Sequence, residues 1–488
     1  MITVIATVAQ YVSIILLAIY GWLCFSIFKS TDKKWKEKKL TRQIVLIFSI
    51  HFLWYLVLFL KMGEMKVLIL YGCEILVAVL YMVLYHRYYP NSSRLITNNM
   101  CFLLLFGYTV LTRINMNYAI RQFAISTVTL LIVSFIPLIM LRYRNLRNYY
   151  YIYGVLGILA LLTVFIPGEG FIHGLSAYGA RNWLAVDFGF ASISVQPSEF
   201  VKILFVFFVA SILAKSTEFR QVVIATAFAV THMGVLVLEK DLGGALIFFV
   251  IYVSMLYVAT RRPLYFFGCL GGACAMGALA FLLLKKQLFQ HVMVRVNNWI
   301  DPWADINDGG YQIAQSLFAI GSGGWFGSGL CEGMPDSIPV RESDFIFSVI
   351  AEEMGVLAAL ILILICFSVF IGFIDVSMKC KQSFYKNMAF GFAICYIFQV
   401  LLNIGGVTKF IPSTGVTLPL VSYGLSSVAS TLIVFQITQG INIITSKEAE
   451  KVEREKEKII AGADSKGTES KRVPAKGKAP KRAKQNSK

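Results

Sequence analysis

The feature that most constrains this chain is a series of apolar runs, each close to the length that crosses a bilayer. A hydrocarbon core of about 30 Å requires roughly 20 apolar residues in a helix. Hydrophobic residues make up 57% of the 488 residues and charged residues only 15%, a balance that a water-soluble fold could not hide from solvent. We therefore predict an all-α fold, built as a polytopic bundle of transmembrane helices.

The length rule predicts thirteen spans. The fourth is the weakest, because it is short and ends in the polar stretch 112–117, so twelve spans are the alternative. The predicted limits are 5–28, 43–61, 65–85, 98–113, 122–141, 148–166, 198–214, 220–238, 242–260, 263–284, 345–375, 388–405 and 421–444.

Basic residues in the connecting loops predict the orientation. The loop 29–42 is rich in lysine, and the positive-inside bias assigns it to the cytoplasm, with the N-terminus outside. The same parity makes two long loops, 167–197 and 285–344, external and the C-terminus cytoplasmic. Four further basic segments agree with it, at 142–147, 215–220, 261–262 and 379–386. The first apolar run lacks a cleavage site after it and is predicted to be an uncleaved helix.

The remaining composition excludes several classes of function. The net charge of +18 resides in short loops and one tail, which indicates topology and not nucleic-acid binding. Nine cysteines without CxxC spacing and five histidines without an HExxH pair predict neither a disulfide framework nor a zinc site. Residues 446–488 are predicted to form a disordered basic cytoplasmic tail, with attraction to anionic lipid as the alternative.

Charged groups in or beside the spans gather at the predicted outer end. Glu199 and Lys202 lie three apart at the start of one span, Asp241 joins two spans, and Arg181 with Trp183 precedes them. Such groups are costly in lipid and mark functional cavities, although a structural ion pair is the alternative for Glu199 and Lys202. We predict a polar cavity that opens to the outer leaflet.

The second external loop and the span after it add further candidates. The loop contributes Arg295, Asp301 and Asp305, and Asp344 begins the span with Glu352 predicted on the same helix face. Purely structural roles, a helix-dipole partner for Asp344 and a buried pair at Glu352 and Glu353, are the alternatives.

Three other segments complete the pattern. Residues 321–330 fit no phosphate-binding motif and are predicted to form a flexible turn. Pro412, Gly415 and Pro419 interrupt any helix over 409–427, a segment expected to line the same cavity. Glu74 lies mid-span in the third helix and is explained only by helix packing.

Seven sequence blocks together resemble the SEDS (shape, elongation, division, sporulation) family, which contains the RodA and FtsW proteins. The resemblance covers roughly residues 98–445 and implies a ten-helix core, with residues 1–97 as an addition of about three transmembrane helices. The blocks, in family order, are GARNW (179–183), QPSEFVK (196–202), DLGGAL (241–246), DPWAD (301–305), GYQIAQSLFAIGSGG (310–324), SDFIFSVIAEEMG (343–355) and STGVTLPLVSYGLSS (413–427).

The resemblance implies that Asp344 is catalytic and that Glu199 and Lys202 support activity. From the other blocks we assign Gln312 and Ser422 to the cavity. The chain departs from the family pattern at Glu342, where many members have histidine, at Ser343, where they have threonine, and at Glu239, where they have glutamine.

The activity implied is peptidoglycan glycosyltransfer, the polymerisation of lipid II into glycan strands at the outer face of the bacterial cytoplasmic membrane, for elongation, division or sporulation. Asp344 would be the base, with Arg181, Lys202 or Arg295 near the pyrophosphate. The cofactor is left open, with a divalent cation (Mg²⁺ or Mn²⁺) as the candidate, and a class B penicillin-binding protein is the implied partner. The alternatives are a lipid II flippase and a non-catalytic scaffold of the cell-wall synthesis complex.

Overall fold

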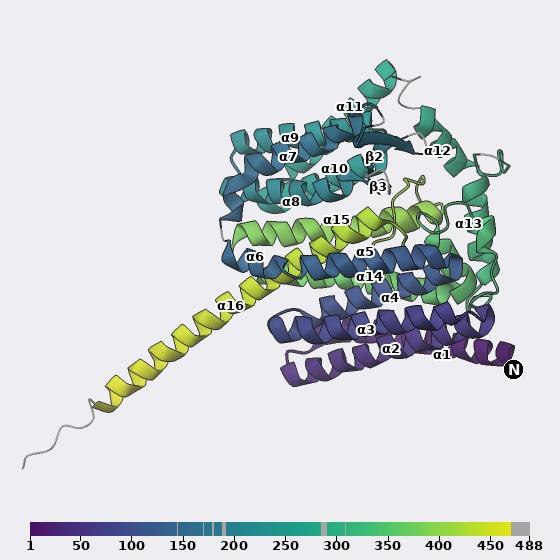
Figure 1. Cartoon of the computed structure of the whole chain (residues 1–488). Coiled ribbons are helices and arrows are strands. Elements are labelled where there is room, and N and C mark those ends of the chain that lie inside the picture. Colours follow the sequence, from purple (N-terminus) through teal and green to yellow (C-terminus); the bar gives the residue numbers. More distant parts are fainter. Residues whose placement is uncertain are drawn as a thin grey trace, which may run out of the picture. The chain divides into compact units, whose positions relative to one another are not determined.

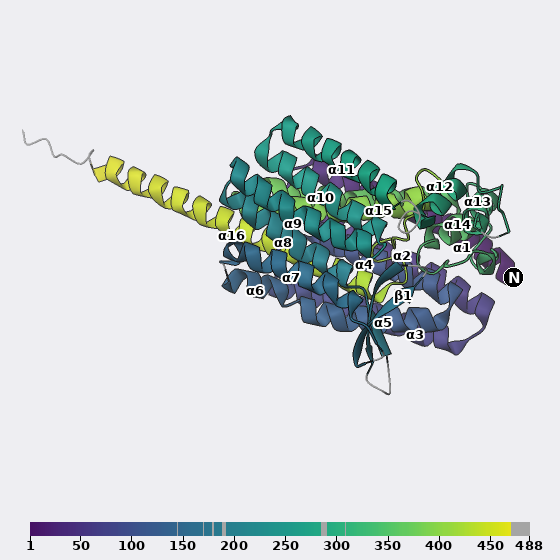
Figure 2. The same ribbon diagram turned by 90° about the horizontal axis from the view of Figure 1, so that it is seen from above.

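The structure is a computed structural model that describes residues 1–143, 145–168, 170–177, 180–187, 192–284, 290–307 and 309–469. Helices dominate it, and the all-α prediction is confirmed (Figures 1 and 2). The helices are α1 (Ile2–Ser26), α2 (Lys33–Met62), α3 (Met65–Tyr88), α4 (Arg94–Ile114), α5 (Met116–Val133), α6 (Ile136–Arg142), α7 (Tyr150–Leu162), α8 (Pro197–Lys215), α9 (Phe219–Leu238), α10 (Leu242–Thr260), α11 (Pro263–Leu284), α12 (Gln290–Ile300), α13 (Tyr311–Gly323), α14 (Ile346–Lys379), α15 (Ser383–Val407) and α16 (Leu425–Glu469).

Twelve helical segments in the described part of the chain are long and apolar enough to cross a membrane. Three of them combine shorter pieces: α1 continues into a 3₁₀ turn (Ile27–Lys29), α5 runs into α6, and α7 is extended by 3₁₀ turns at both ends. The predicted span 263–284 corresponds to α11, whose apolar stretch in the described side chains is shorter, Pro263–Leu279. The protein is therefore a multi-pass membrane protein.

The first three helices pack on the rest of the bundle through α4 and α14. Glu74 is buried on α3, with Oε2 3.1 Å from Nε2 of His51 and Oε1 accepting from the Tyr55 hydroxyl at 2.9 Å. The Tyr55 oxygen also lies 3.0 Å from Oγ1 of Thr112 on α4. An ionisable group inside a bilayer requires such partners, so the network accounts for Glu74 and joins α2 and α3 to α4.

A small antiparallel sheet, β1 (Ile172–Ala177), β2 (Ala180–Asp187) and β3 (Ser192–Val195), forms in the predicted external loop 167–197. It was not predicted from the sequence. The strands follow one another in space in the order β1-β2-β3, with Leu175 opposite Trp183 and Leu184 opposite Val195. The sheet lies at the end of the bundle where α12 begins (Figure 1).

Helix α14 is interrupted at Gly355, which has φ 89° and ψ 162°. The loop after α13 supplies the missing backbone partners: the Ser328 amide donates to the Glu352 carbonyl at 2.9 Å, and the Val356 amide donates to the Gly324 carbonyl at 3.0 Å. The predicted flexible turn is thus held by backbone hydrogen bonds. These bonds remove the cost of exposing unpaired polar groups to lipid.

The chain divides into two compact units, residues 1–443 and 444–488. In the second unit α16 continues to Glu469, so residues 446–469, predicted to be disordered, are helical. Glu450 and Arg454, like Lys451 and Glu455, are four apart in the sequence, a spacing that stabilises exposed helices. The tail beyond residue 469 lies outside the described residues.

We expect Gly355→Ala to lower the free energy of unfolding by about 2 kcal/mol or more, because a Cβ there requires a strained positive φ and would lie 2.4 Å from the Gly327 nitrogen. Thermal unfolding of the purified protein in detergent measures the effect. The matched control is Gly268→Ala on α11, where a Cβ meets no atom within 4 Å. Equal unfolding temperatures for the two variants would contradict the role assigned to the interruption.

Candidate functional site

A polar cavity of ≈ 440 Å³ lies at the end of the bundle that carries the sheet and α12. Strand β2, the first turns of α8 and α10, helix α12, the segment before α14 and the non-helical segment after α15 form its wall. Seven of the ten residues predicted for the site line it: Trp183, Glu199, Lys202, Asp241, Arg295, Gln312 and Asp344.

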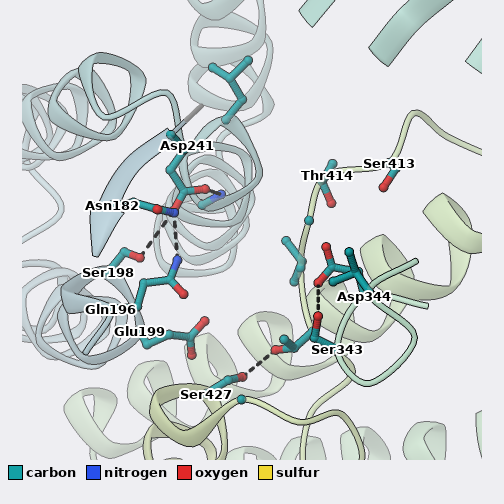
Figure 3. A pocket seen from close by; sticks show the side chains of 18 of the residues that line it. Asn182, Gln196, Ser198, Glu199, Asp241, Ser343, Asp344, Ser413, Thr414 and Ser427 are labelled. Atoms are coloured by element: carbon teal, nitrogen blue, oxygen red, sulfur yellow. Dashed lines mark hydrogen bonds between the residues drawn. The ribbon is translucent and has the colours of Figure 1, made fainter. Parts of the chain in front are cut away.

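Asp241 forms one pole of the cavity, at the start of α10 (Figure 3). Its Oδ1 accepts from the Gly244 amide at 2.8 Å, which caps the helix. Its Oδ2 lies 3.4 Å from both Nε2 of Gln196 and Oγ of Ser198, and 3.5 Å from Nδ2 of Asn182. Burial raises the pKa of Asp241, and these donors oppose that rise by favouring the carboxylate.

Glu199 and Lys202 form a buried ion pair on the first turns of α8. Nζ of Lys202 donates to Glu199 Oε2 at 2.6 Å and to Gln399 Oε1 at 2.8 Å, and the Ser430 hydroxyl donates to the same Glu199 oxygen at 2.7 Å. A cation with two short internal partners is less available to a ligand than a free one. The pair therefore joins α8 to α15 and α16 where these side chains line the cavity. This arrangement agrees with the alternative in which Glu199 and Lys202 form a structural ion pair.

Asp344 forms the opposite pole, facing the segment that contains Ser413 and Thr414 (Figure 3). The Ser343 hydroxyl donates to Asp344 Oδ1 at 3.1 Å. On α15, Asn403 donates to the Asp344 carbonyl at 2.9 Å and to the Val416 carbonyl at 2.7 Å. One amide group thus holds the main chain beside Asp344 against the facing wall.

Three charged or polar neighbours and burial set the protonation of Asp344. Burial raises its pKa above that of an ordinary aspartate; the Ser343 hydroxyl and the Arg295 guanidinium lower the pKa, and the Glu342 carboxylate raises it. The net direction is upward. A carboxylate with a raised pKa is a stronger base than aspartate in water, which suits it to remove a proton.

Residues 408–424 contain no helix and carry the inner wall of the cavity, as the prolines and Gly415 predicted. Gly415 has φ 71°, and a Cβ there would lie 3.6 Å from Asp344 Oδ2 and 4.0 Å from Arg295 Nη2. Nη1 of Arg295 donates to the Ser413 carbonyl at 3.5 Å. Arg295, from α12, therefore places its guanidinium near the carboxyl of Asp344.

Three predicted site residues do not line the cavity. Arg181 donates from its backbone to the Glu239 carbonyl at 2.9 Å and from Nη2 to the Ile166 carbonyl at 3.3 Å. It therefore connects β2 to the end of α9 and to the segment that follows α7. The Ser422 hydroxyl donates to the Ser343 carbonyl at 2.5 Å and accepts from the Leu418 amide at 2.9 Å, which places it behind the wall.

Glu352 is the third of these, and its predicted position on one helix face with Asp344 is wrong. Helix α14 begins at Ile346, so Asp344 lies in the turn before it. Glu352 Oε1 instead accepts from the Met334 amide at 2.9 Å.

Other lining residues were missed by the sequence reasoning. Asn182, Gln196 and Ser198 belong to blocks quoted above, and their proximity to Asp241 required the fold. Lys240 and Glu342 also line the cavity, and Lys240 adopts a positive φ of 62°. The described part of the chain contains no group of three or more His, Cys, Asp or Glu side chains placed to hold a metal ion.

Glu239, where the family has glutamine, is a buried carboxyl at the end of α9 with 1% of its surface exposed. Among the residues that the structure describes, its Oε1 has no hydrogen-bond partner. Burial, assisted by the neighbouring charge of Asp241, raises its pKa to about 8. The protonated form is therefore favoured near neutral pH.

Comparison with known proteins identifies relatives of the chain. The FtsW/RodA/SpoVE family model, described as a cell cycle protein, matches residues 93–447. The "peptidoglycan glycosyltransferase RodA" of Mycobacterium tuberculosis is 35% identical over 280 residues, which cover 54% of this chain and 58% of that protein. The "probable peptidoglycan glycosyltransferase FtsW" of Francisella salina is 30% identical over 362 residues, 70% of this chain and 85% of the relative. The match thus spans just over half the length of the mycobacterial relative.

Solved structures share the fold. A chain from a study of polymerisation and crosslinking by a peptidoglycan synthase complex aligns with a TM-score of 0.59 at 24% identity, covering 72% of this chain and 98% of that one. The rod shape determining protein RodA of Thermus thermophilus aligns with a TM-score of 0.51 at 23% identity, covering 72% and 96%.

We expect Glu239→Gln to stabilise the protein at pH 8 and to leave its stability unchanged near pH 4.5. The folded carboxyl titrates near pH 8 and the unfolded one near its ordinary value of 4.5, so the folded state holds more protons between these values and loses stability as the pH rises through that window. Glutamine cannot ionise, so the variant escapes this loss. The measurement is the unfolding temperature against pH, with the exposed Glu218→Gln as control; parallel curves for wild type and Glu239→Gln would contradict the assignment.

Proposed function

Because the chain belongs to the FtsW/RodA/SpoVE family of cell cycle proteins, we propose that it is a peptidoglycan glycosyltransferase that polymerises lipid II into glycan strands. The names of its relatives support this activity. The observation that carries the proposal is the position of Asp344: a carboxyl with a raised pKa faces a polar cavity, with Arg295 as the neighbouring cation.

The reaction follows from these two groups. The 4-hydroxyl of the acceptor sugar loses its proton to the Asp344 carboxylate while its oxygen bonds to the anomeric carbon of the donor. The bond from that carbon to the lipid pyrophosphate breaks, and the pyrophosphate leaves with the electron pair. This single displacement inverts the configuration at the anomeric carbon.

The leaving pyrophosphate needs charge stabilisation more than a proton, because it is already a weak base. Arg295 and Lys240 line the cavity with exposed side chains, whereas Lys202 is committed to Glu199 and Gln399. We assign pyrophosphate stabilisation to Arg295 and Lys240, and a supporting role to Lys202.

The cavity would open on the outer face of the cytoplasmic membrane, with the N-terminus outside and the C-terminus in the cytoplasm. The basic loops at 29–42 and 142–147 support this orientation through the positive-inside bias. The N-terminus lies at the same end of the bundle as α12 and α13 (Figure 1). A class B penicillin-binding protein is the proposed partner, in keeping with a related fold studied within a peptidoglycan synthase complex.

We expect Asp344→Asn to lower the rate of polymer formation by about 10²-fold or more, because the amide keeps the volume of the side chain and removes the base. The assay is glycan formation from purified lipid II in detergent, with and without the penicillin-binding partner. Wild-type polymer with an active Asp344→Asn enzyme would contradict the assignment of the base. Movement of labelled lipid II from one leaflet of a vesicle membrane to the other, without any polymer, would instead favour the alternative that the protein is a lipid II flippase.

The pH dependence of polymerisation tests the electrostatics of Asp344. Activity should rise with pH as the carboxyl loses its proton, along a limb displaced above the range of an ordinary aspartate. Glu342→Gln should move this limb to lower pH by removing a negative neighbour, and Arg295→Gln should move it to higher pH by removing a positive one. Profiles of kcat/KM for the three proteins decide the point; shifts of the same sign would contradict the assignment.

A further inference from the structure

Residues 1–92 lie outside the family match, and their contacts lead toward the candidate catalytic carboxyl. The element nearest to Asp344 in this series of contacts is the short helical segment 346–354, which lies between Asp344 and the interruption at Gly355. Because Gly355 separates it from the rest of α14, this segment is not held by a continuous helix. Its position depends on side contacts.

The loop 324–334, between α13 and α14, makes several of those contacts. The Ser328 and Gly329 amides donate to the carbonyls of Glu352 and Glu353 at 2.9 and 3.0 Å. The Met334 amide donates to Glu352 Oε1 at 2.9 Å. The loop therefore holds the segment 346–354 from the side of the added helices.

The added helices in turn hold the loop. Nε2 of Gln10, on α1, donates to the Phe326 carbonyl at 2.6 Å and to the Gly327 carbonyl at 2.9 Å. Lys61, at the end of α2, forms an ion pair with Glu332. The two contacts lie at opposite ends of the loop, so together they fix it against α1 and α2.

A small, mostly apolar pocket lies at the same junction. Gln10 and Ser13 of α1, Trp54 of α2, Leu330 of the loop and Glu353 of the segment all line it. From α4, Arg113 Nε donates to Glu353 Oε1 at 2.9 Å. Three helices outside α14 thus meet the segment that leads to Asp344.

We propose that Gln10 and Lys61 are positioning residues: through the loop 324–334 they fix the segment 346–354 and hence Asp344, so that the added N-terminal helices tune the glycosyl transfer. The inference rests on the proposed function. A mutation far from the chemistry that misplaces a reacting group by about 1 Å can slow an enzyme by about 10²-fold.

The test uses the full chain in detergent with three variants. Gln10→Leu removes both hydrogen bonds from Nε2 to the loop. Lys61→Glu places a negative charge opposite Glu332 and so replaces the ion pair with repulsion. The control Tyr20→Phe also breaks a contact between the added helices and the core, the 2.8 Å bond from the Tyr20 hydroxyl to Asn99 Oδ1, but that contact does not involve the loop.

The first readout is hydrogen–deuterium exchange of peptides covering residues 341–356, which requires no activity. Gln10→Leu and Lys61→Glu should speed exchange there, and Tyr20→Phe should not. The second readout is polymerisation: kcat should fall by about tenfold with KM within twofold of wild type, and Lys61→Glu with Glu332→Lys should restore it.

Unchanged exchange over 341–356 in both loop variants would overturn the proposal, as would equal effects in Tyr20→Phe, which would reduce the added helices to a general support of the fold. If wild type forms no polymer, the proposed function fails, and the exchange experiment still decides whether the added helices hold the Asp344 segment.

Discussion

The structure depends on one constraint: every backbone amide and carbonyl at membrane depth needs a partner, since lipid supplies none. Two segments break the helical pattern, at Gly355 in α14 and over residues 408–424. In both places other parts of the chain supply hydrogen bonds, from the loop 324–329 in the first case and from Asn403 in the second. The candidate base, Asp344, precedes the first interruption in the chain and faces the second, at Gly415. The irregular backbone therefore provides the place at which a carboxyl can face a cavity instead of lipid.

The charges of the cavity follow from the same constraint. Acidic groups are spread around its wall, and each is held differently: Glu199 by a cation, Asp241 by a helix cap and amide donors, Asp344 by one hydroxyl and a nearby guanidinium. Direct partners occupy the oxygens of a carboxyl that would otherwise meet a substrate hydroxyl. Asp344 has the fewest direct partners of the three. That difference in environment, more than its position in the sequence, distinguishes Asp344 as the group able to accept a proton.

The sequence predicted the spans well because membrane crossing depends on local apolar length, and it predicted the cavity because charges in such spans are rare and costly. It failed where the outcome depends on tertiary contact. The partner of Glu74 lies on another helix. Arg181 was assigned to the cavity from its position in an outer loop. The sheet that forms in this loop directs its side chain to the Ile166 carbonyl, and the strands show no clear alternating pattern in the sequence that would have predicted the sheet. Glu352 was misplaced because a helix face was projected through a turn that ends before Ile346.

The added helices illustrate how a membrane protein attaches a new element without a hydrophobic driving force, since lipid is as apolar as a buried leucine. Their attachment includes polar contacts of Tyr20 with Asn99, of Tyr55 with Thr112, and of Gln10 with the carbonyls of the loop before α14. The first two join side chains on regular helices, so they add stability without bending the backbone. The third meets irregular backbone, and the ion pair between Lys61 and Glu332 reaches the same loop. A contact of that kind biases a segment that has more than one way to satisfy its hydrogen bonds, so an element added for stability acquires influence over the site.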